Sequence, residues 1–219
     1  MTSPLQPAND FDSSDEEEGE GDQEKLDISW ISLPGCEQEG RSLAISPLPG
    51  FRFGERKGSV AADVEDIMRS GVDNVFVLCT SRELQRYGVP SLLHEFSAAG
   101  LCVNHHPIED GSVPSTEECG QLLQQLMKSL TQYKQVLIHC FNGLGRSCLV
   151  VALLIMLLDD SVTGDDVLEK VRSIKGPGAV QTVRQYNMIQ EFRKIIEENP
   201  ELFSGISSPL SSPVRAESR

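Results

Sequence analysis

The stretch "LIHCFNGLGRSC", residues 137–148, joins two apolar segments through a short loop that contains two glycines. A cysteine stands where the first segment ends, and an arginine and a serine stand where the second begins. Gly143 and Gly145 can take a positive φ, so the N–H groups of the loop can turn inward together. A ring of N–H groups above a helix N-terminus binds anions, phosphate above all. The stretch therefore predicts a phosphate-binding loop between a strand and a helix.

Three side chains of this stretch suit chemistry at phosphorus. The field of the loop favours the thiolate form of Cys140. Arg146 returns to the same side of the loop and can hold two phosphate oxygens at once. A thiolate beneath a bound phosphate is an in-line nucleophile, and its attack gives a cysteinyl-phosphate. Ser147 can then donate a hydrogen bond to the sulfur and help it to leave.

The residues between the cysteine and the serine form the predicted phosphate-binding loop: Phe141, Asn142, Gly143, Leu144, Gly145 and Arg146. His139 precedes the cysteine. We expect its ring to form a hydrogen bond with the backbone and so fix the loop, rather than to act as a base. A buried cysteine beside an ordinary strand–helix turn is the plainer alternative, because a cysteine and an arginine at this spacing recur by chance. The histidine, the glycines and the serine together favour the catalytic interpretation.

The remaining pattern places this loop at one edge of a sheet. Strands are predicted at 27–33, 42–50, 74–79, 101–107 and 135–140. Helices are predicted at 60–70, 89–100, 115–133, 146–159, 164–175 and 182–198. This alternation indicates an α/β fold with a mainly parallel central sheet and helices on both faces. Ligands of such sheets bind beyond the carboxyl ends of the strands, and Cys140 lies at one of these ends.

Composition divides the chain into three parts. Residues 1–26 are acidic and residues 204–219 are rich in serine and proline, so both are predicted to be disordered tails. Residues 27–203 are predicted to form one folded domain. The net charge is −14 at pH 7, without the basic surface that binds nucleic acid or membranes. We expect a soluble, intracellular monomer, in the cytoplasm or at or in the nucleus, with no nucleic-acid or membrane partner.

The segment 106–115 is the place to seek a general acid, which must protonate the leaving alkoxide. It follows a predicted parallel strand, so it lies at the same sheet edge as Cys140, and its composition suits a mobile loop. Asp110 and Glu109 both qualify. Gln181 follows a Gly-Pro-Gly break and either orients the hydrolytic water or is a polar residue at a helix N-terminus.

The six cysteines show no CxxC pair and no spacing typical of a zinc site. Cys79 ends one predicted parallel strand and Cys140 ends another. Cys79 could therefore trap an oxidised Cys140 as a disulfide, although most buried cysteines are inert. His105 and His106 have no partner at metal-ligand spacing, and thiolate chemistry requires neither a metal nor a cofactor.

The His-Cys-x5-Arg-Ser pattern resembles the cysteine-dependent protein phosphatases, in their dual-specificity branch. With "FDSSDEEE", "ISWISL", "HHPIEDG" and "AVQTVRQYN", it is most similar to the kinase-associated phosphatases, over about residues 11–196. The resemblance implies the cysteine-dependent phosphatase fold for residues 27–203. It also implies a cell-cycle regulator that removes phosphate from the activation-segment threonine of a cyclin-dependent kinase.

Residue by residue, the resemblance makes Cys140 the nucleophile, Arg146 the phosphate clamp and Ser147 the aid to the leaving sulfur. It favours Asp110 over Glu109 as the general acid. Two alternatives stay open: a protein that chiefly binds and inhibits the kinase, and another Cys-x5-Arg enzyme such as an arsenate reductase or a sulfurtransferase. The positions of Asp110 and Ser147 speak against the second alternative.

The chain departs from the family pattern at three places. Phe141-Asn142 replace a usual Tyr-Gly, and Asn104 replaces the first of three usual histidines. Residues 80–83 read Thr-Ser-Arg-Glu in place of Thr-Arg-Gly-Glu. The first change is expected to alter the pocket rim and to leave the chemistry intact.

Overall fold

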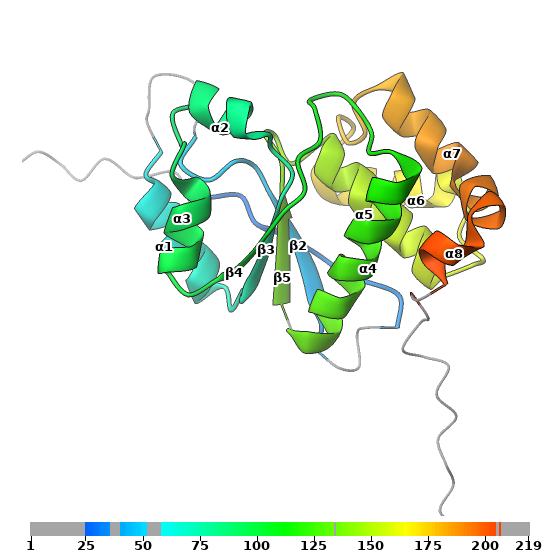
Figure 1. The fold of residues 1–219 in the computed structure, drawn as a ribbon, viewed down its shortest axis with the longest axis horizontal. Helices are drawn as coiled ribbons and strands as arrows, with labels where there is room; N and C mark the ends of the chain where they lie inside the picture. Colours follow the sequence, from blue (N-terminus) through cyan, green and yellow to red (C-terminus); the bar gives the residue numbers. More distant parts are fainter. Residues whose placement is uncertain (1–24, 36–39, 52–57, 134, 205, 207–219) are drawn as a thin grey trace, which may run out of the picture.

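The computed structural model describes residues 25–35, 40–51, 58–133, 135–204 and 206 (Figure 1). Their centre is a five-stranded sheet in the order β1-β2-β5-β3-β4. The strands are β1 (Ser29–Ile31), β2 (Ser42–Ser46), β3 (Asn74–Val77), β4 (Cys102–His105) and β5 (Gln135–His139). All neighbours pair in parallel except β1, which runs antiparallel to β2. The predicted α/β fold with a mainly parallel sheet is confirmed.

Helices cover both faces of the sheet (Figure 1). One face carries α1 (Val60–Arg69), α2 (Ser81–Arg86) and α3 (Leu92–Ala98). The other carries α4 (Thr116–Gln132), α5 (Arg146–Leu158), α6 (Gly164–Lys175), α7 (Val183–Glu198) and α8 (Pro200–Phe203). The central strands β2, β5 and β3 are mostly buried because each of their two faces packs against a layer of helices, whereas the edge strands β1 and β4 are partly exposed.

The alternation of side chains along β5 divides the core in two. Val136 and Ile138 pack into the cluster beneath α4 to α7, whereas Leu137 packs into the cluster beneath α1 to α3. All three side chains are fully buried. The central strand is thereby fixed between two apolar layers, and it carries the residue after its end, Cys140, to a defined position.

Side-chain caps fix where the helices begin. Ser59, Ser115 and Thr163 accept hydrogen bonds from backbone N–H groups in the first turns of α1, α4 and α6. The helix α2 is an addition to the predicted elements. It begins after Thr80, whose hydroxyl accepts from the Glu83 N–H while the Glu83 carboxylate accepts from the Thr80 N–H.

The two predicted tails lie almost entirely outside the described residues. Leu26 and Ile206 stand at their inner edges, and both side chains are buried. Among the described residues, no helix has both the length and the apolar character that a membrane span requires.

Candidate active site

The loop after β5 has the strand–loop–helix setting that the sequence predicts. Cys140 is 2% exposed and directly follows β5, and α5 begins at Arg146. Gly143 has φ +69°, and a Cβ on it would lie 2.8 Å from the Ser46 carbonyl oxygen. A larger residue there would collide with the backbone after β2, so the tight approach of loop and sheet requires glycine.

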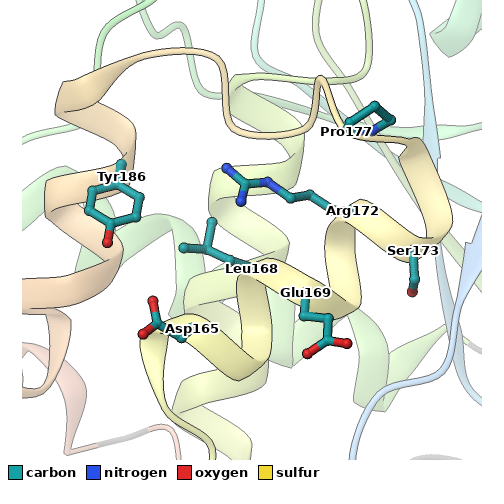
Figure 2. Close-up of a pocket in the computed structure, with 7 residues that line it drawn as sticks. All are labelled: Asp165, Leu168, Glu169, Arg172, Ser173, Pro177 and Tyr186. Carbon is teal, nitrogen blue, oxygen red and sulfur yellow. The ribbon is translucent and has the colours of Figure 1, made fainter.

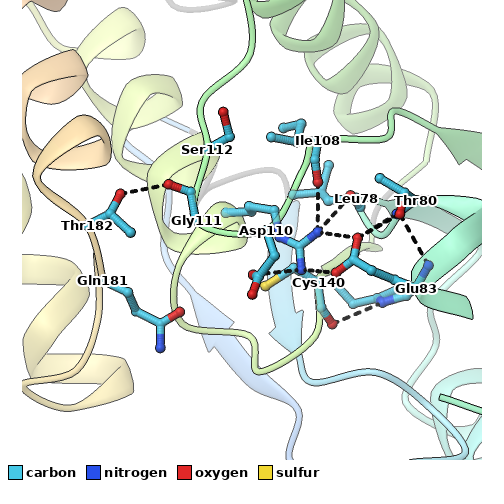
Figure 3. Close-up of polar contacts among 12 residues, drawn as sticks. Leu78, Thr80, Glu83, Ile108, Asp110, Gly111, Ser112, Cys140, Gln181 and Thr182 are labelled. Carbon is cyan, nitrogen blue, oxygen red and sulfur yellow. Dashed lines mark hydrogen bonds and ion pairs between the residues drawn. The ribbon is translucent and has the colours of Figure 1, made fainter. Parts of the chain in front are cut away.

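The sequence allows a positive φ at both glycines of the loop. Gly145 does not adopt one, because its φ is −86°. The space that a Cβ would take there is occupied by the amide of Gln181, whose Oε1 would lie 2.8 Å away. The structure therefore brings Gln181 against the phosphate-binding loop, as the sequence suggests (Figure 3). Its role in orienting water stays a prediction.

Arg146 is 1% exposed, lies within electrostatic reach of Cys140 and is held in a fixed orientation. Figure 3 shows the polar contacts of this site. Its Nη1 donates to Glu83 Oε2 at 2.8 Å and to the Ile108 carbonyl oxygen at 2.7 Å. Its Nη2 donates to Glu83 Oε1 at 2.7 Å. This two-point carboxylate contact fixes the plane of the guanidinium group. Burial alone would lower the pKa of Arg146, but the hydrogen bond to Glu83 and the negative charge of neighbouring groups together raise it overall, so the group stays charged.

Glu83 is a residue of the site that the sequence analysis does not identify. Its carboxylate binds the Arg146 guanidinium and also accepts bonds from the Thr80 N–H at 2.8 Å and hydroxyl at 3.0 Å. Burial alone would raise the pKa of Glu83, but the hydrogen bonds from Arg146 and Thr80 lower it overall. One side chain thus caps α2 and holds the arginine. The Thr80–Glu83 capping-box spacing is the sequence signal that could have revealed it.

Asp110 is the acidic residue of the 106–115 segment whose carboxylate reaches the site. Its Oδ1 lies 3.1 Å from Arg146 Nη2, and its side chain is 64% exposed. A carboxylate that is tethered at one oxygen and open to solvent can both meet a substrate and exchange protons with water. This geometry supports Asp110 over Glu109 as the candidate acid.

His139 and Ser147 are both buried beside the nucleophile. Burial lowers the pKa of His139 to about 4, so its ring is neutral near pH 7. Its Nδ1 lies 3.5 Å from the Cys140 carbonyl oxygen, which fits the predicted structural role. The hydroxyl of Ser147 has no hydrogen-bond partner among the described residues. It is therefore free to serve a group that the reaction creates.

Cys79 lies close to Cys140 at the neighbouring strand end. The N–H of Leu78 donates to the His139 carbonyl oxygen at 3.0 Å, which joins the two strand ends immediately before both cysteines. Cys79 is fully buried, and burial raises the pKa of its thiol even though Arg146 is nearby. Cys79 is therefore a protonated, protected thiol next to the candidate nucleophile.

We expect mild peroxide to join Cys79 and Cys140, because a sulfenic acid on Cys140 would condense with the adjacent thiol. Peptide mass spectrometry of the oxidised wild type should show this linkage. In Cys79→Ser, Cys140 should instead proceed to the sulfinic acid, and a thiol reductant should then fail to restore phosphatase activity. Cys148 provides the control, since its thiol is also buried. A disulfide between Cys140 and Cys148 would contradict the prediction. So would full recovery of the activity of Cys79→Ser after reduction.

Other polar groups and one hollow of the described residues lie outside the phosphate-binding loop. His105 Nε2 lies 2.8 Å from the Cys79 carbonyl oxygen, and His106 Nε2 lies 2.7 Å from Gln125 Oε1. Within the described part of the chain, no three His, Cys, Asp or Glu side chains are placed to hold a metal ion. A hollow of about 600 Å³ between α6 and α7 is lined by residues outside the phosphate-binding loop (Figure 2): Asp165, Leu168, Glu169, Arg172, Ser173, Pro177 and Tyr186.

Known proteins similar to this chain agree with the geometry. The solved structure of kinase associated phosphatase, with its catalytic-site cysteine replaced by serine, has a TM-score of 0.73 and 36% identity. The match covers 80% of this chain and 98% of that one. A mutant form of the phosphatase Tk-PTP has a TM-score of 0.61 and 30% identity over 78% of this chain and 97% of its own. The fold is thus that of the cysteine-dependent phosphatases.

Curated relatives and a family model point the same way. "Cyclin-dependent kinase inhibitor 3" of Homo sapiens is 41% identical over 186 residues, which are 84% of this chain and 86% of that protein. The protein of the same name from Rattus norvegicus is 40% identical over 188 residues, 85% of this chain and 87% of its own. The model of the family "Cyclin-dependent kinase inhibitor 3 (CDKN3)" matches residues 1–168. The chain belongs to this family, and it is a cysteine-dependent protein phosphatase of dual specificity.

Proposed function

We propose that the chain removes phosphate from the activation-segment threonine of a cyclin-dependent kinase, through a phosphocysteine intermediate on Cys140. The observation that carries the proposal is the buried Arg146, fixed by Glu83 next to Cys140 and tied to Asp110. The kinase as partner is supported by the names of the relatives, each called a cyclin-dependent kinase inhibitor. The resemblance in sequence points to the activation-segment threonine.

The reaction has two steps, in which Asp110 first gives and then takes a proton. In the first step the Cys140 thiolate attacks phosphorus, the bond from phosphorus to the threonine oxygen breaks, and Asp110 protonates that oxygen. In the second step a water attacks phosphorus and gives its proton to the Asp110 carboxylate. The sulfur–phosphorus bond breaks, and the products are inorganic phosphate and the Cys140 thiolate.

The groups around the phosphate stabilise the charge in both steps. The Nε of Arg146 is buried without a partner among the described residues, so this edge of the guanidinium is open to a phosphate oxygen. The amides of the loop, which the sequence predicts to turn inward, are expected to bind the remaining oxygens. Ser147 donates its unpartnered hydroxyl to the sulfur as the sulfur leaves in the second step. None of these roles requires a metal ion.

The composition of the loop favours a phosphoprotein over a phosphoinositide as substrate. Residues 141–145 contain no lysine, whereas a multiply charged lipid headgroup needs additional cations inside the loop. The rim carries an aromatic stack instead. The rings of Phe141 and Tyr87 lie 4.0 Å apart at 14°, and Phe51 packs against both. An apolar rim of this kind suits the side chains that flank a phosphorylated residue.

A second candidate function is a kinase-binding inhibitor in which catalysis is secondary. The name of the family, a cyclin-dependent kinase inhibitor, favours it. The Cys140→Ser protein separates the two. If it still inhibits a threonine-phosphorylated cyclin-dependent kinase as strongly as the wild type, binding is the main activity. If inhibition disappears with phosphate release, catalysis is the main activity.

Replacement of Asp110 by Asn is expected to slow release of phosphate from a phosphothreonine substrate by roughly 10²–10⁴-fold, since the alkoxide leaves unprotonated. The value of kcat/KM with p-nitrophenyl phosphate, which reports transfer of the phosphoryl group to Cys140, should fall much less, because nitrophenolate leaves without a proton. Steady-state kinetics with both substrates measure this contrast. Glu109→Gln is the matched control, with the same chemical change one residue away. If Glu109→Gln lost most of the rate with the phosphothreonine substrate and Asp110→Asn kept it, Glu109 would be the general acid instead of Asp110.

A further inference from the structure

The segment 176–182, which links α6 to α7, lies between two loops of the site. We define the acid loop as residues 107–114. The N–H of Val180 donates to the Leu144 carbonyl oxygen at 2.9 Å, which joins this segment to the phosphate-binding loop. Val180 has φ +62°, which is strained for a β-branched residue. Such a conformation persists where its surroundings fix it, and it is enriched near functional sites.

The first turn of α7 binds the acid loop directly. The hydroxyl of Thr182 donates to the Gly111 carbonyl oxygen at 2.9 Å, and Gln185 Nε2 donates to the Ser112 carbonyl oxygen at 3.3 Å (Figure 3 shows the first contact). Gln185 is fully buried, and its Oε1 accepts from the Gln181 N–H at 2.9 Å. Both ends of this buried amide are therefore occupied, which fixes its orientation. These contacts fall on the two residues that follow Asp110.

The opposite side of the acid loop is bound by Arg146. Its Nη1 donates to the Ile108 carbonyl oxygen at 2.7 Å, and its Nη2 meets the Asp110 carboxylate at 3.1 Å. Arg146 thus holds the Ile108 carbonyl before Asp110, and the first turn of α7 holds the Gly111 and Ser112 carbonyls after it. The composition of this segment suggests a mobile loop. In the structure, however, hydrogen bonds anchor the acid loop on both sides of Asp110.

We propose that Thr182 and Gln185 are positioning residues that hold Asp110 over the phosphate-binding loop before a substrate arrives. The inference rests on the proposed function, in which Asp110 is the general acid. A proton donor that is already placed spares the reaction the cost of ordering the loop, and a displacement of about 1 Å can cost roughly 100-fold in rate. Both residues bind the acid loop directly. Gln185 also accepts from the Gln181 N–H and lies beside Gly145, so the Thr182 variant is the cleaner test of positioning.

The experiment is steady-state kinetics of the full-length Thr182→Val protein with a phosphothreonine peptide and with p-nitrophenyl phosphate. We expect kcat for the peptide to fall roughly 10–100-fold. The fall in kcat/KM for p-nitrophenyl phosphate, which reports transfer of the phosphoryl group to Cys140, should stay below about 3-fold, because that leaving group needs little protonation. KM should change little. Thr182→Ser restores the hydroxyl and should restore the rate, and Gln185→Met should reproduce the pattern of Thr182→Val.

Thr163→Val is the matched control for loss of a helix cap. Thr182 caps α7 and Thr163 caps α6 through the same hydroxyl-to-backbone bond, but only Thr182 also touches the acid loop. Thr163→Val should lower the melting temperature and leave both rates unchanged. If Thr182→Val merely lowers stability in the same way, with both substrates affected equally, the positioning role is wrong.

A double variant tests whether Thr182 acts through Asp110. In the Asp110→Asn background, adding Thr182→Val should cause no further loss with the peptide, because the group that it positions is gone. Multiplicative losses in the double variant would overturn the proposal. A wild-type protein that turns over neither substrate would instead overturn the proposed function, and the positioning role with it.

Discussion

Replacement of Cys140 by Ser is expected to lower phosphate release by roughly 10⁴-fold or more, with a phosphothreonine substrate and with p-nitrophenyl phosphate alike. Serine has nearly the same shape, so the loop and its amides should persist. Its hydroxyl stays protonated at neutral pH and is a poor nucleophile toward phosphorus. Equal loss with both substrates distinguishes this variant from Asp110→Asn, in which the better leaving group is spared.

Binding must be measured beside the rate, because the variant is expected to retain it. Isothermal titration with inorganic phosphate should show affinity for Cys140→Ser comparable to that of the wild type. Cys119→Ser is the control, since its thiol is also buried but lies in α4. It should keep the wild-type rate. If Cys140→Ser kept more than a tenth of the rate, another group would have to be the nucleophile.

Replacement of Glu83 by Gln is expected to lower the free energy of unfolding by about 3 kcal/mol, because it leaves the buried Arg146 with only the solvent-exposed Asp110 as a counter-charge. The activity of the folded fraction should also fall, by roughly 100-fold, since the guanidinium loses the two-point contact that orients it. Urea unfolding followed by circular dichroism measures the first effect. Turnover of p-nitrophenyl phosphate in the absence of urea measures the second.

The same pair predicts a dependence of stability on pH. The folded-state pKa of Glu83 lies below that of an unfolded glutamate, which is about 4.3. The contribution of the Glu83 carboxylate to the free energy of unfolding is therefore complete above about pH 4.3. It is lost as the pH falls through the lower folded-state pKa. The stability difference between wild type and Glu83→Gln should be largest near pH 7 and should shrink below about pH 4.

Glu65→Gln is the matched control for the loss of an ion pair. Glu65 pairs with Arg69 on the surface of α1, where both side chains are more than half exposed. Its loss should cost less than about 0.5 kcal/mol at any pH, because solvent screens the pair. Equal costs for Glu65→Gln and Glu83→Gln would mean that the buried pair does not hold Arg146 in place.

The parts of the site that are predictable from sequence are those that depend on local spacing. The phosphate-binding loop needs only a buried strand, two glycines and a helix start within residues 137–148, and all of these are visible in the letters. The 106–115 segment is found because parallel strands end at one edge of a sheet, and the family resemblance favours Asp110 over Glu109 within it. The roles of its neighbours within the loop depend on contacts that spacing does not encode.

Glu83 and Gln185 show what the sequence leaves out. Glu83 meets Arg146 across 63 residues, and it lies on a helix of six residues that is too short to produce an apolar period. Gln185 reaches Ser112 across 73 residues. Both contacts exist only because the sheet brings distant strand ends and helix starts together, so their partners cannot be inferred from local pattern alone.

The most direct test of a thiolate mechanism is to trap the phosphocysteine. Asp110→Asn should be mixed with p-nitrophenyl phosphate, quenched with acid within milliseconds and digested for mass spectrometry. The first step remains fast with this leaving group, while hydrolysis lacks its base, so the intermediate should accumulate. The account predicts one phosphate on the peptide that contains Cys140, with its sulfur as the attachment site. Turnover with no phosphorylated peptide, or with the phosphate on any other residue, would contradict it.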